Sequence, residues 1–161
     1  MKVIVYTDGA TSGNPGPGGY GVYMFTREIK RSKQLSQGFR LTTNNRMELM
    51  AVIAALEQLK NPPQDVELHT DSKYISDAVN QSWLWRWAKG NFKDKKNADL
   101  WHRFIRLYKK HRVKINWVKG HAENPYNQHV DGLAVAASQG DALHVDRNYE
   151  KSHFFRPRPQ G

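Results

Sequence analysis

The first forty residues of the chain carry three strand-like segments, and this constrains the fold more than any other feature. Residues 2–7 and 20–27 are rich in β-branched and aromatic side chains, which favour strands, and we expect residues 34–41 to form the third strand. Residues 9–19 are rich in Gly, Asn and Pro, and we expect them to form a loop without regular structure. A basic, polar connection joins the second segment to the third. This order predicts an antiparallel three-strand meander.

Helix-like and strand-like segments alternate after the meander. Residues 45–60 repeat apolar side chains at three- and four-residue spacing, typical of an amphipathic helix, and two prolines follow. We expect further strands at 66–70 and 113–118, and helices at 72–81, 83–88, 99–110 and 127–139. The predicted class is α/β, with a mixed five-stranded sheet (three antiparallel strands, then parallel strands) flanked by helices. Periodicity ends at Gly140, so we expect one domain over 1–140 and a basic, partly mobile tail over 141–161.

Composition excludes several classes of protein. No run approaches the roughly 18 to 20 apolar residues of a membrane span, so we expect no membrane association. The chain contains no cysteine, which excludes disulfides, thiolate metal sites and cysteine nucleophiles and is consistent with a cytoplasmic protein. At 161 residues a single domain with a real core is expected, and we expect a monomer.

The positive charge is concentrated in one segment. The chain has a formal net charge of +10, and residues 86–114 hold eleven Lys or Arg against two Asp or Glu. Aromatic residues interleave with these cations, namely Trp83, Trp85, Trp87, Phe92 and Trp101. Such a segment indicates a nucleic-acid surface. The alternative is a solvated helix face whose aromatic side chains pack inward.

Four acids stand out against this basic background. Asp8 and Asp71 follow strands that we expect to be adjacent and parallel, Glu48 begins the helix after the third strand, and Asp131 lies near the start of the last helix. The carboxyl ends of parallel strands are the usual place for function in α/β folds. Clustered carboxylates repel one another unless a cation neutralises them, and hard divalent cations prefer oxygen ligands. The acids therefore indicate a divalent metal site and phosphoryl-transfer chemistry.

Each acid also has a purely structural explanation. Asp8, before Gly9, suits a turn, and Asp71 suits a helix N-cap. Glu48 has the spacing to complete a capping box with Asn45. Asp131 suits the first turn of a helix, where the helix dipole favours a negative charge.

Five segments resemble type 1 ribonuclease H of the bacterial kind: TDGATSGNPGPGGYG, TTNNRMELMAVIAAL, HTDSKY, WVKGHAENPYNQHVDGLA and the basic segment with its tryptophans. The resemblance covers about residues 2–140. It implies the ribonuclease H-like fold and a cation-dependent endonuclease that cuts the RNA strand of RNA–DNA hybrids, leaving 5′-phosphate and 3′-hydroxyl ends. It also implies that Asp8, Glu48, Asp71 and Asp131 bind two Mg²⁺ ions, with Mn²⁺ a possible substitute.

The resemblance assigns separate tasks within this site. Asp8 is expected to bridge both cations, and Asp131 to serve the one that activates water. Glu48 and Asp71 are expected to serve the cation at the leaving group. His121 matches the catalytic histidine of the family, which implies proton transfer or help in product release.

The resemblance also implies contacts with an RNA–DNA hybrid duplex. Recognition of RNA requires contact with 2′-hydroxyls across a shallow minor groove; the residues that match such positions are Thr11, Asn14, Asn44 and Asn45. Turn and cap chemistry is the alternative for these side chains. Contacts to the DNA strand are expected from Thr43, Trp83 and Asn97. Non-specific attraction to phosphates is expected from Lys89, Lys93, Lys95 and Lys96.

The chain departs from the family pattern at two places, and two alternative functions are also consistent with the sequence. The basic segment is shorter than in common bacterial relatives and has Phe92 where a tryptophan is common. Lys73 stands where the family often has Gln, and could contact phosphate or lower the pKa of a neighbouring acid. The other functions are a nuclease of the same fold with a different substrate, and a hybrid-binding module without catalysis. Cleavage of a panel of duplexes would separate them.

Overall fold

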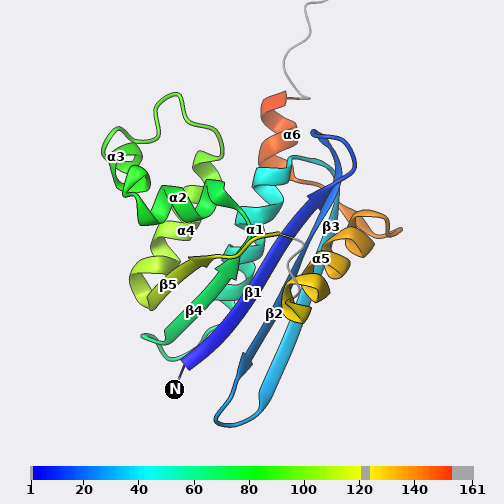
Figure 1. The fold of residues 1–161 in the computed structure, drawn as a ribbon. Helices are drawn as coiled ribbons and strands as arrows, with labels where there is room; N and C mark the ends of the chain where they lie inside the picture. Colours follow the sequence, from blue (N-terminus) through cyan, green and yellow to red (C-terminus); the bar gives the residue numbers. More distant parts are fainter. Residues whose placement is uncertain (1, 121–123, 154–161) are drawn as a thin grey trace, which may run out of the picture.

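The computed structural model describes residues 2–120 and 124–153 (Figure 1). Three long strands come first, β1 (Lys2–Thr11), β2 (Gly16–Thr26) and β3 (Arg31–Thr42). Two shorter strands follow at β4 (Asp65–Thr70) and β5 (Arg112–Trp117). The helices between them are α1 (Asn44–Glu57), α2 (Lys73–Asn80), α3 (Trp83–Lys89) and α4 (Ala98–Lys110). After β5 come α5 (Pro125–Ser138), β6 (Leu143–His144) and α6 (Arg147–His153).

The strands form one mixed sheet in the order β5-β4-β1-β2-β3-β6. β1, β2 and β3 pair antiparallel, while β4 pairs parallel with both β1 and β5, as the sequence predicts. The predicted count of five strands is wrong, because a two-residue sixth strand pairs parallel with β3. A strand that short leaves no alternating pattern in the sequence.

The prediction of an irregular loop over residues 9–19 is also wrong. β1 continues to Thr11 and β2 begins at Gly16, so only a short turn separates them. The glycines of β2 are needed because α5 crosses this part of the sheet closely. A Cβ on Gly19 would lie 2.6 Å from the carbonyl oxygen of Ala134, and one on Gly21 would lie 2.5 Å from that of Val130. Glycine here permits close packing of a helix on a strand.

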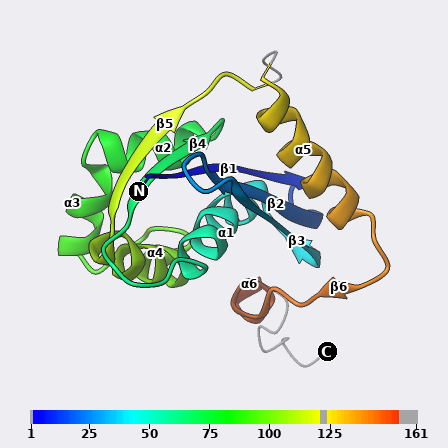
Figure 2. The ribbon, with the colours of Figure 1, turned by 90° about the horizontal axis from the view of Figure 1, so that it is seen from below.

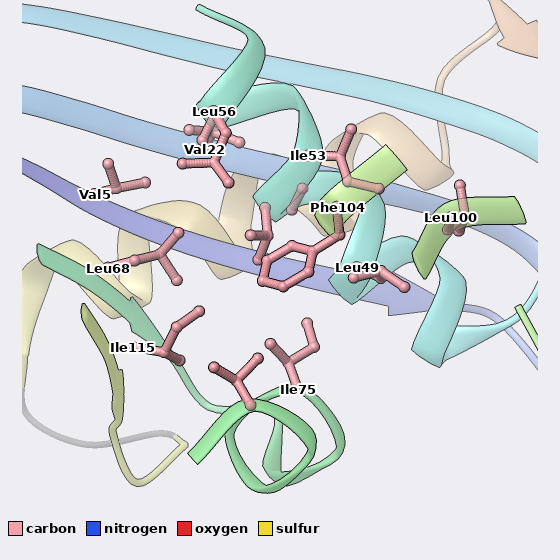
Figure 3. Close-up of a cluster of buried hydrophobic side chains, with 14 of the residues drawn as sticks. Val5, Val22, Leu49, Ile53, Leu56, Leu68, Ile75, Leu100, Phe104 and Ile115 are labelled. Carbon is pink, nitrogen blue, oxygen red and sulfur yellow. The ribbon is translucent and has the colours of Figure 1, made fainter. Parts of the chain in front are cut away.

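Alternation along β1 supplies both faces of the sheet. Val3 and Val5 face the main core, whereas Ile4 and Tyr6 form a second cluster with Val130 of α5. Figure 2 shows α5 on one face of the sheet and α1 with α4 on the other. The main core joins strands and helices, and Figure 3 shows its side chains pointing toward one another between them.

The segment after Gly140 contains two elements that the sequence did not predict, β6 and α6. Asp146, between them, is 3% exposed and accepts hydrogen bonds from buried Arg46. Glu150 of α6 is 2% exposed and accepts two hydrogen bonds from Arg40 of β3. Buried carboxylates are tolerated because they are paired. The sequence gives no periodicity here because charged pairs, rather than an apolar stripe, hold the segment.

No helix of the described segments is long and apolar enough to cross a membrane.

Candidate active site

Ile4, Tyr6 and Asp8 are alternate residues of β1, so their side chains point to the same face of the sheet. This is the face that α5 covers. Asp8 is 4% exposed. Its Oδ1 accepts a hydrogen bond of 2.9 Å from the backbone N–H of Gly9. The strand continues for three residues beyond it, so the turn explanation for this acid does not hold.

Gly9 lets α1 bring Glu48 to the same place. A Cβ on Gly9 would lie 2.5 Å from the backbone nitrogen of Glu48 and 2.6 Å from the carbonyl carbon of Met47. Thr43 is the N-cap of α1 and accepts from the N–H of Arg46. Since the helix begins at Asn44, Glu48 lies beyond the capping box, and the predicted pairing with Asn45 is not formed.

Asp71 comes directly after β4, which pairs parallel with β1 as far as Thr7 and Thr70. The predicted adjacency of these two strand ends is confirmed. The N-cap of α2 is Ser72, whose side chain accepts from the N–H of Ile75, so Asp71 is not needed as a cap. The indole N–H of Trp117, at the end of β5, donates to the Asp71 carbonyl oxygen at 3.0 Å.

Asp131 reaches the site from α5. This helix begins at Pro125, with the Asn124 side chain as its cap, rather than at 127 as predicted. Asp131 therefore lies in the second turn, and the first-turn dipole explanation does not apply. Its side chain is within hydrogen-bonding reach of Asp8. Together with Asp8 and Asp71 it lines a cavity of about 80 Å³, which Asn127 and Gln128 also line.

Like charges dominate this site. One carboxylate oxygen from each of Asp8, Glu48 and Asp71 lies within 4.8 Å of the others. Burial, with the charge of Asp71 adding to it, raises the pKa of Asp8 to about 8. Burial and then the charge of Asp8 raise the pKa of Glu48 well above its ordinary value. The Oε1 atom of Glu48 also has no hydrogen-bond partner within the described chain.

These residues fit a hard divalent cation. The donor set is oxygen only, which suits Mg²⁺ or Mn²⁺. A cation would neutralise the charges that repel one another and would satisfy the unpaired oxygen of Glu48. The cluster does not serve folding, because repulsion among its carboxylates destabilises the folded state.

A polar cleft of about 790 Å³ lies beside α1 and the basic segment. It brings together six residues that the sequence analysis expected to contact a hybrid, namely Asn14, Thr43, Asn45, Lys95, Lys96 and Asn97. Asn44 adjoins this group, since its N–H donates to the side chain of Asn14 at 3.0 Å. Thr11, Trp83, Lys89 and Lys93 do not line the cleft.

The aromatic residues of the basic segment divide between core and surface. Phe92 and Trp101 are 3% and 0% exposed, so the alternative of inward packing is correct for them. Trp83, Trp85 and Trp87 are half-buried. Lys95 lies over the Trp87 ring, with its Nζ 5.1 Å from the ring centre. This cation–π contact holds Lys95 against the half-buried aromatic surface of α3.

His121 lies outside the described residues. Sequence analysis missed two features of the site region: the amide of Asn127 beside the acids, and the buried Arg46 that joins Asp99 to Asp146. Asn127 precedes Asp131 by four residues, and this spacing puts both on one helix face. That spacing is the signal that could have found it.

A cluster of carboxylates at the carboxyl rim of a mixed sheet, beside a basic cleft, places the chain among the nucleases of the α/β class. The family model described as RNase H matches residues 1–139. The chain is 52% identical to the ribonuclease H of Trichodesmium erythraeum, with 92% of this chain and 96% of that protein covered. It is 49% identical to the ribonuclease HI of Synechocystis sp., with 93% and 96% covered.

Among solved structures, LC9-RNase H1, a type 1 RNase H with the type 2 active-site motif, aligns with a TM-score of 0.78 and 30% identity. The alignment covers 95% of this chain and 82% of that one. The chain belongs to the RNase H family and is a type 1 endoribonuclease.

Proposed function

We propose that the chain hydrolyses the RNA strand of RNA–DNA hybrids, using divalent cations held by Asp8, Glu48, Asp71 and Asp131. The observation that carries the proposal is the convergence of these four acids from β1, α1, the end of β4 and α5. Two of them have strongly raised pKa values. Raised pKa values of clustered carboxylates are typical of functional sites, and a bound cation would offset the repulsion among the carboxylates.

When bound, two Mg²⁺ ions about 3.5–4 Å apart would activate a water and stabilise the leaving oxygen of an in-line displacement. Water then attacks phosphorus, the bond from phosphorus to the 3′ oxygen breaks, and the products end in 5′-phosphate and 3′-hydroxyl. In this scheme Asp8 would help to hold both cations, Asp131 would hold the one that activates water, and Glu48 and Asp71 would hold the one at the leaving group. His121 would transfer a proton during the reaction or assist release of the product.

The cleft beside α1 supports a duplex substrate. We assign the RNA strand to Thr11, Asn14, Asn44 and Asn45, and the DNA strand to Thr43, Trp83 and Asn97. Asn97 is held in place because its Oδ1 accepts from Arg46 and its Nδ2 donates to the hydroxyl of Tyr74. LC11-RNase H1, a protein of the same fold with a TM-score of 0.62 and 24% identity, was crystallised with an RNA/DNA hybrid. A monomeric state and a cytoplasmic location stay predictions from the sequence.

Cleavage of strand-labelled duplexes tests this proposal. The protein should cut the RNA strand of a hybrid with Mg²⁺ or Mn²⁺, cut neither RNA nor DNA duplexes, and lose activity in EDTA. Asp8→Asn should abolish cleavage but retain binding of the hybrid, because the amide keeps the shape and removes a cation ligand. Asp141→Asn makes the same change at an exposed position and should retain activity. Turnover by Asp8→Asn, or cleavage in EDTA, would contradict the mechanism.

A further inference from the structure

Asn127 is a buried polar residue beside the acids to which the proposed hydrolysis gives no task. It is 3% exposed, and its Oδ1 has no hydrogen-bond partner among residues 2–120 and 124–153. A buried acceptor without a donor costs about 1–3 kcal/mol. An apolar side chain of similar size would avoid this cost. The amide oxygen therefore calls for a donor that residues 2–120 and 124–153 do not supply.

The start of α5 fixes the position of Asn127. The Asn124 side chain accepts from the backbone N–H of Tyr126 at 2.8 Å and from that of Asn127 at 3.3 Å. Pro125 occupies the first turn, where its restricted φ favours the helix. Asn127 precedes Asp131 by four residues, so both side chains lie on the same face of the helix.

That face borders the cavity of about 80 Å³ among the acids, and Asn127 lines it together with Asp8, Asp71 and Asp131. A water molecule occupies roughly 30 Å³ in the liquid, so the cavity has room for a cation with one or two waters of its shell. Mg²⁺ keeps several of its waters when proteins bind it. Each of these waters donates hydrogen bonds and needs acceptors in fixed positions.

We propose that Asn127 is a positioning residue for this hydration shell. Its Oδ1 accepts a hydrogen bond from a water of the cation held on the side of Asp8 and Asp131, and so aims that water at phosphorus. This inference rests on the cation-dependent hydrolysis proposed above. A neutral amide suits the task because it adds an acceptor without adding a fifth negative charge to a site where like charges already repel.

Two substitutions separate this task from a structural one. Asn127→Leu removes the acceptor and keeps similar volume, whereas Asn127→Asp keeps an acceptor oxygen and adds charge. In EDTA, Asn127→Leu should unfold at the same or higher urea concentration than the parent, because a buried unpaired oxygen is gone. Its Kd for Mn²⁺, from calorimetric titration without substrate, should rise about tenfold or more. Asn127→Asp should retain Mn²⁺ binding and lose stability in EDTA.

Kinetics on an RNA–DNA hybrid give a further readout. Asn127→Leu should lower kcat and leave KM unchanged, since the side chain acts on the attacking water rather than on the duplex. Gln139→Leu removes an exposed amide at the other end of α5, and it should change neither the Mn²⁺ Kd nor kcat.

The outcomes distinguish this inference from the proposed function. If Asn127→Leu is destabilised in EDTA and binds Mn²⁺ as the parent does, the residue is structural and the inference is wrong. If Asp8→Asn loses Mn²⁺ binding in the same titration, the cation site itself stands even then. If Asp8→Asn binds Mn²⁺ as tightly as the parent, the proposed function fails and the inference fails with it.

Discussion

Gly9 sets how closely α1 approaches β1, and with it the separation of Asp8 and Glu48. An added Cβ would meet the backbone of α1 at 2.5 Å, so the helix would have to move as a body. We predict that Gly9→Ala lowers the free energy of unfolding by about 1–3 kcal/mol, as overpacking of a core does. It should also weaken Mn²⁺ binding, because the two acids are drawn apart. Urea unfolding and calorimetric titration measure the two effects.

Gly132 offers a matched control beside another acid of the site. It is exposed and follows Asp131, and an added Cβ would meet nothing within 4 Å. Gly132→Ala should therefore stabilise α5 by up to about 1 kcal/mol, since Ala exceeds Gly in helix propensity by that amount. Its Mn²⁺ affinity should equal that of the parent. If Gly9→Ala behaved like this control, the close approach would not be what positions Glu48.

At the scale of single residues, the sequence identified acids better than amides. Asp8, Glu48, Asp71 and Asp131 could be predicted because charge in an apolar context is visible in the sequence. The structural alternatives for Glu48 and Asp131 failed because α1 begins at Asn44 and α5 at Pro125. Those for Asp8 and Asp71 failed because β1 continues beyond Asp8 and Ser72 caps α2. Asn127 was missed although its four-residue spacing from Asp131 is visible in the sequence, because only the packed structure shows that its amide oxygen is buried without a partner among the described residues.

The β6–α6 segment is held to the domain by charged pairs. Arg46 is 3% exposed and donates to both Asp99 and Asp146. Burial lowers the pKa of Arg46, but these two hydrogen-bonded carboxylates outweigh it and raise the pKa above the ordinary value. Removing one partner of a buried ion pair costs about 3–5 kcal/mol. We predict that truncation after residue 140 destabilises the domain by at least about 3 kcal/mol, as measured by urea unfolding.

A second truncation isolates the pairs as the cause. Ending the chain at residue 153 keeps Asp146 and Glu150 with their arginine partners, so its stability should equal that of the full chain. A protein of residues 1–140 that is as stable as the full chain would contradict the prediction.

The lysines of the basic segment differ in their position relative to the cleft beside α1. Lys95 and Lys96 line the cleft beside α1, whereas Lys89 and Lys93 do not. We predict that Lys95→Ala and Lys96→Ala each reduce by about one the slope of log K for hybrid binding against log salt, as loss of one phosphate contact does. Lys2→Ala removes a lysine at the start of β1, paired there with Glu67, and should leave the slope unchanged. Equal slopes in all variants would show that the lysines of the cleft do not contact phosphates of the hybrid.

At the scale of elements, regular patterns were predictable and exceptions were not. The helix over 45–60 and the meander follow from spacing that the structure retains. The glycine-rich start of β2 was predicted as a loop because the demand for glycine comes from α5, far along the chain. The β6–α6 segment was missed because a buried salt bridge leaves no periodic trace.

At the scale of the whole molecule, the candidate site is where like charges oppose folding. The acids of the site come from β1, α1, the end of β4 and α5, so the main secondary elements converge on a point of mutual repulsion. Elsewhere several carboxylates are paired: hydrogen bonds with Arg112, His69 and Arg40 lower the pKa values of Asp65, Glu67 and Glu150 respectively. Without a cation, the dependence of the free energy of unfolding on pH should therefore report on the acids of the site.

We predict that the free energy of unfolding in EDTA falls as pH rises from about 4 to about 8. Burial raises the pKa of folded Asp8 from an ordinary value of 3.8 to about 8, and Glu48 shifts in the same direction. The folded state thus binds more protons than the unfolded chain in this window, and raising the pH removes that advantage. Carboxylates with lowered pKa values contribute with the opposite sign, mainly below about pH 5, where the unfolded groups titrate. His111, whose pKa burial lowers, also contributes with this opposite sign.

Asp8→Asn separates the site from these other groups. Between pH 5 and pH 8 the parent in EDTA should lose more than about 1.4 kcal/mol relative to this variant, the equivalent of one pKa unit. The variant should be the more stable of the two near pH 8. Saturating Mg²⁺ should remove the loss in the parent, because a cation that binds only the folded state stabilises it and competes with protons. Parallel profiles for parent and variant in EDTA would show that the four acids do not repel one another in the folded protein, and the case for a cation site would lose its physical basis.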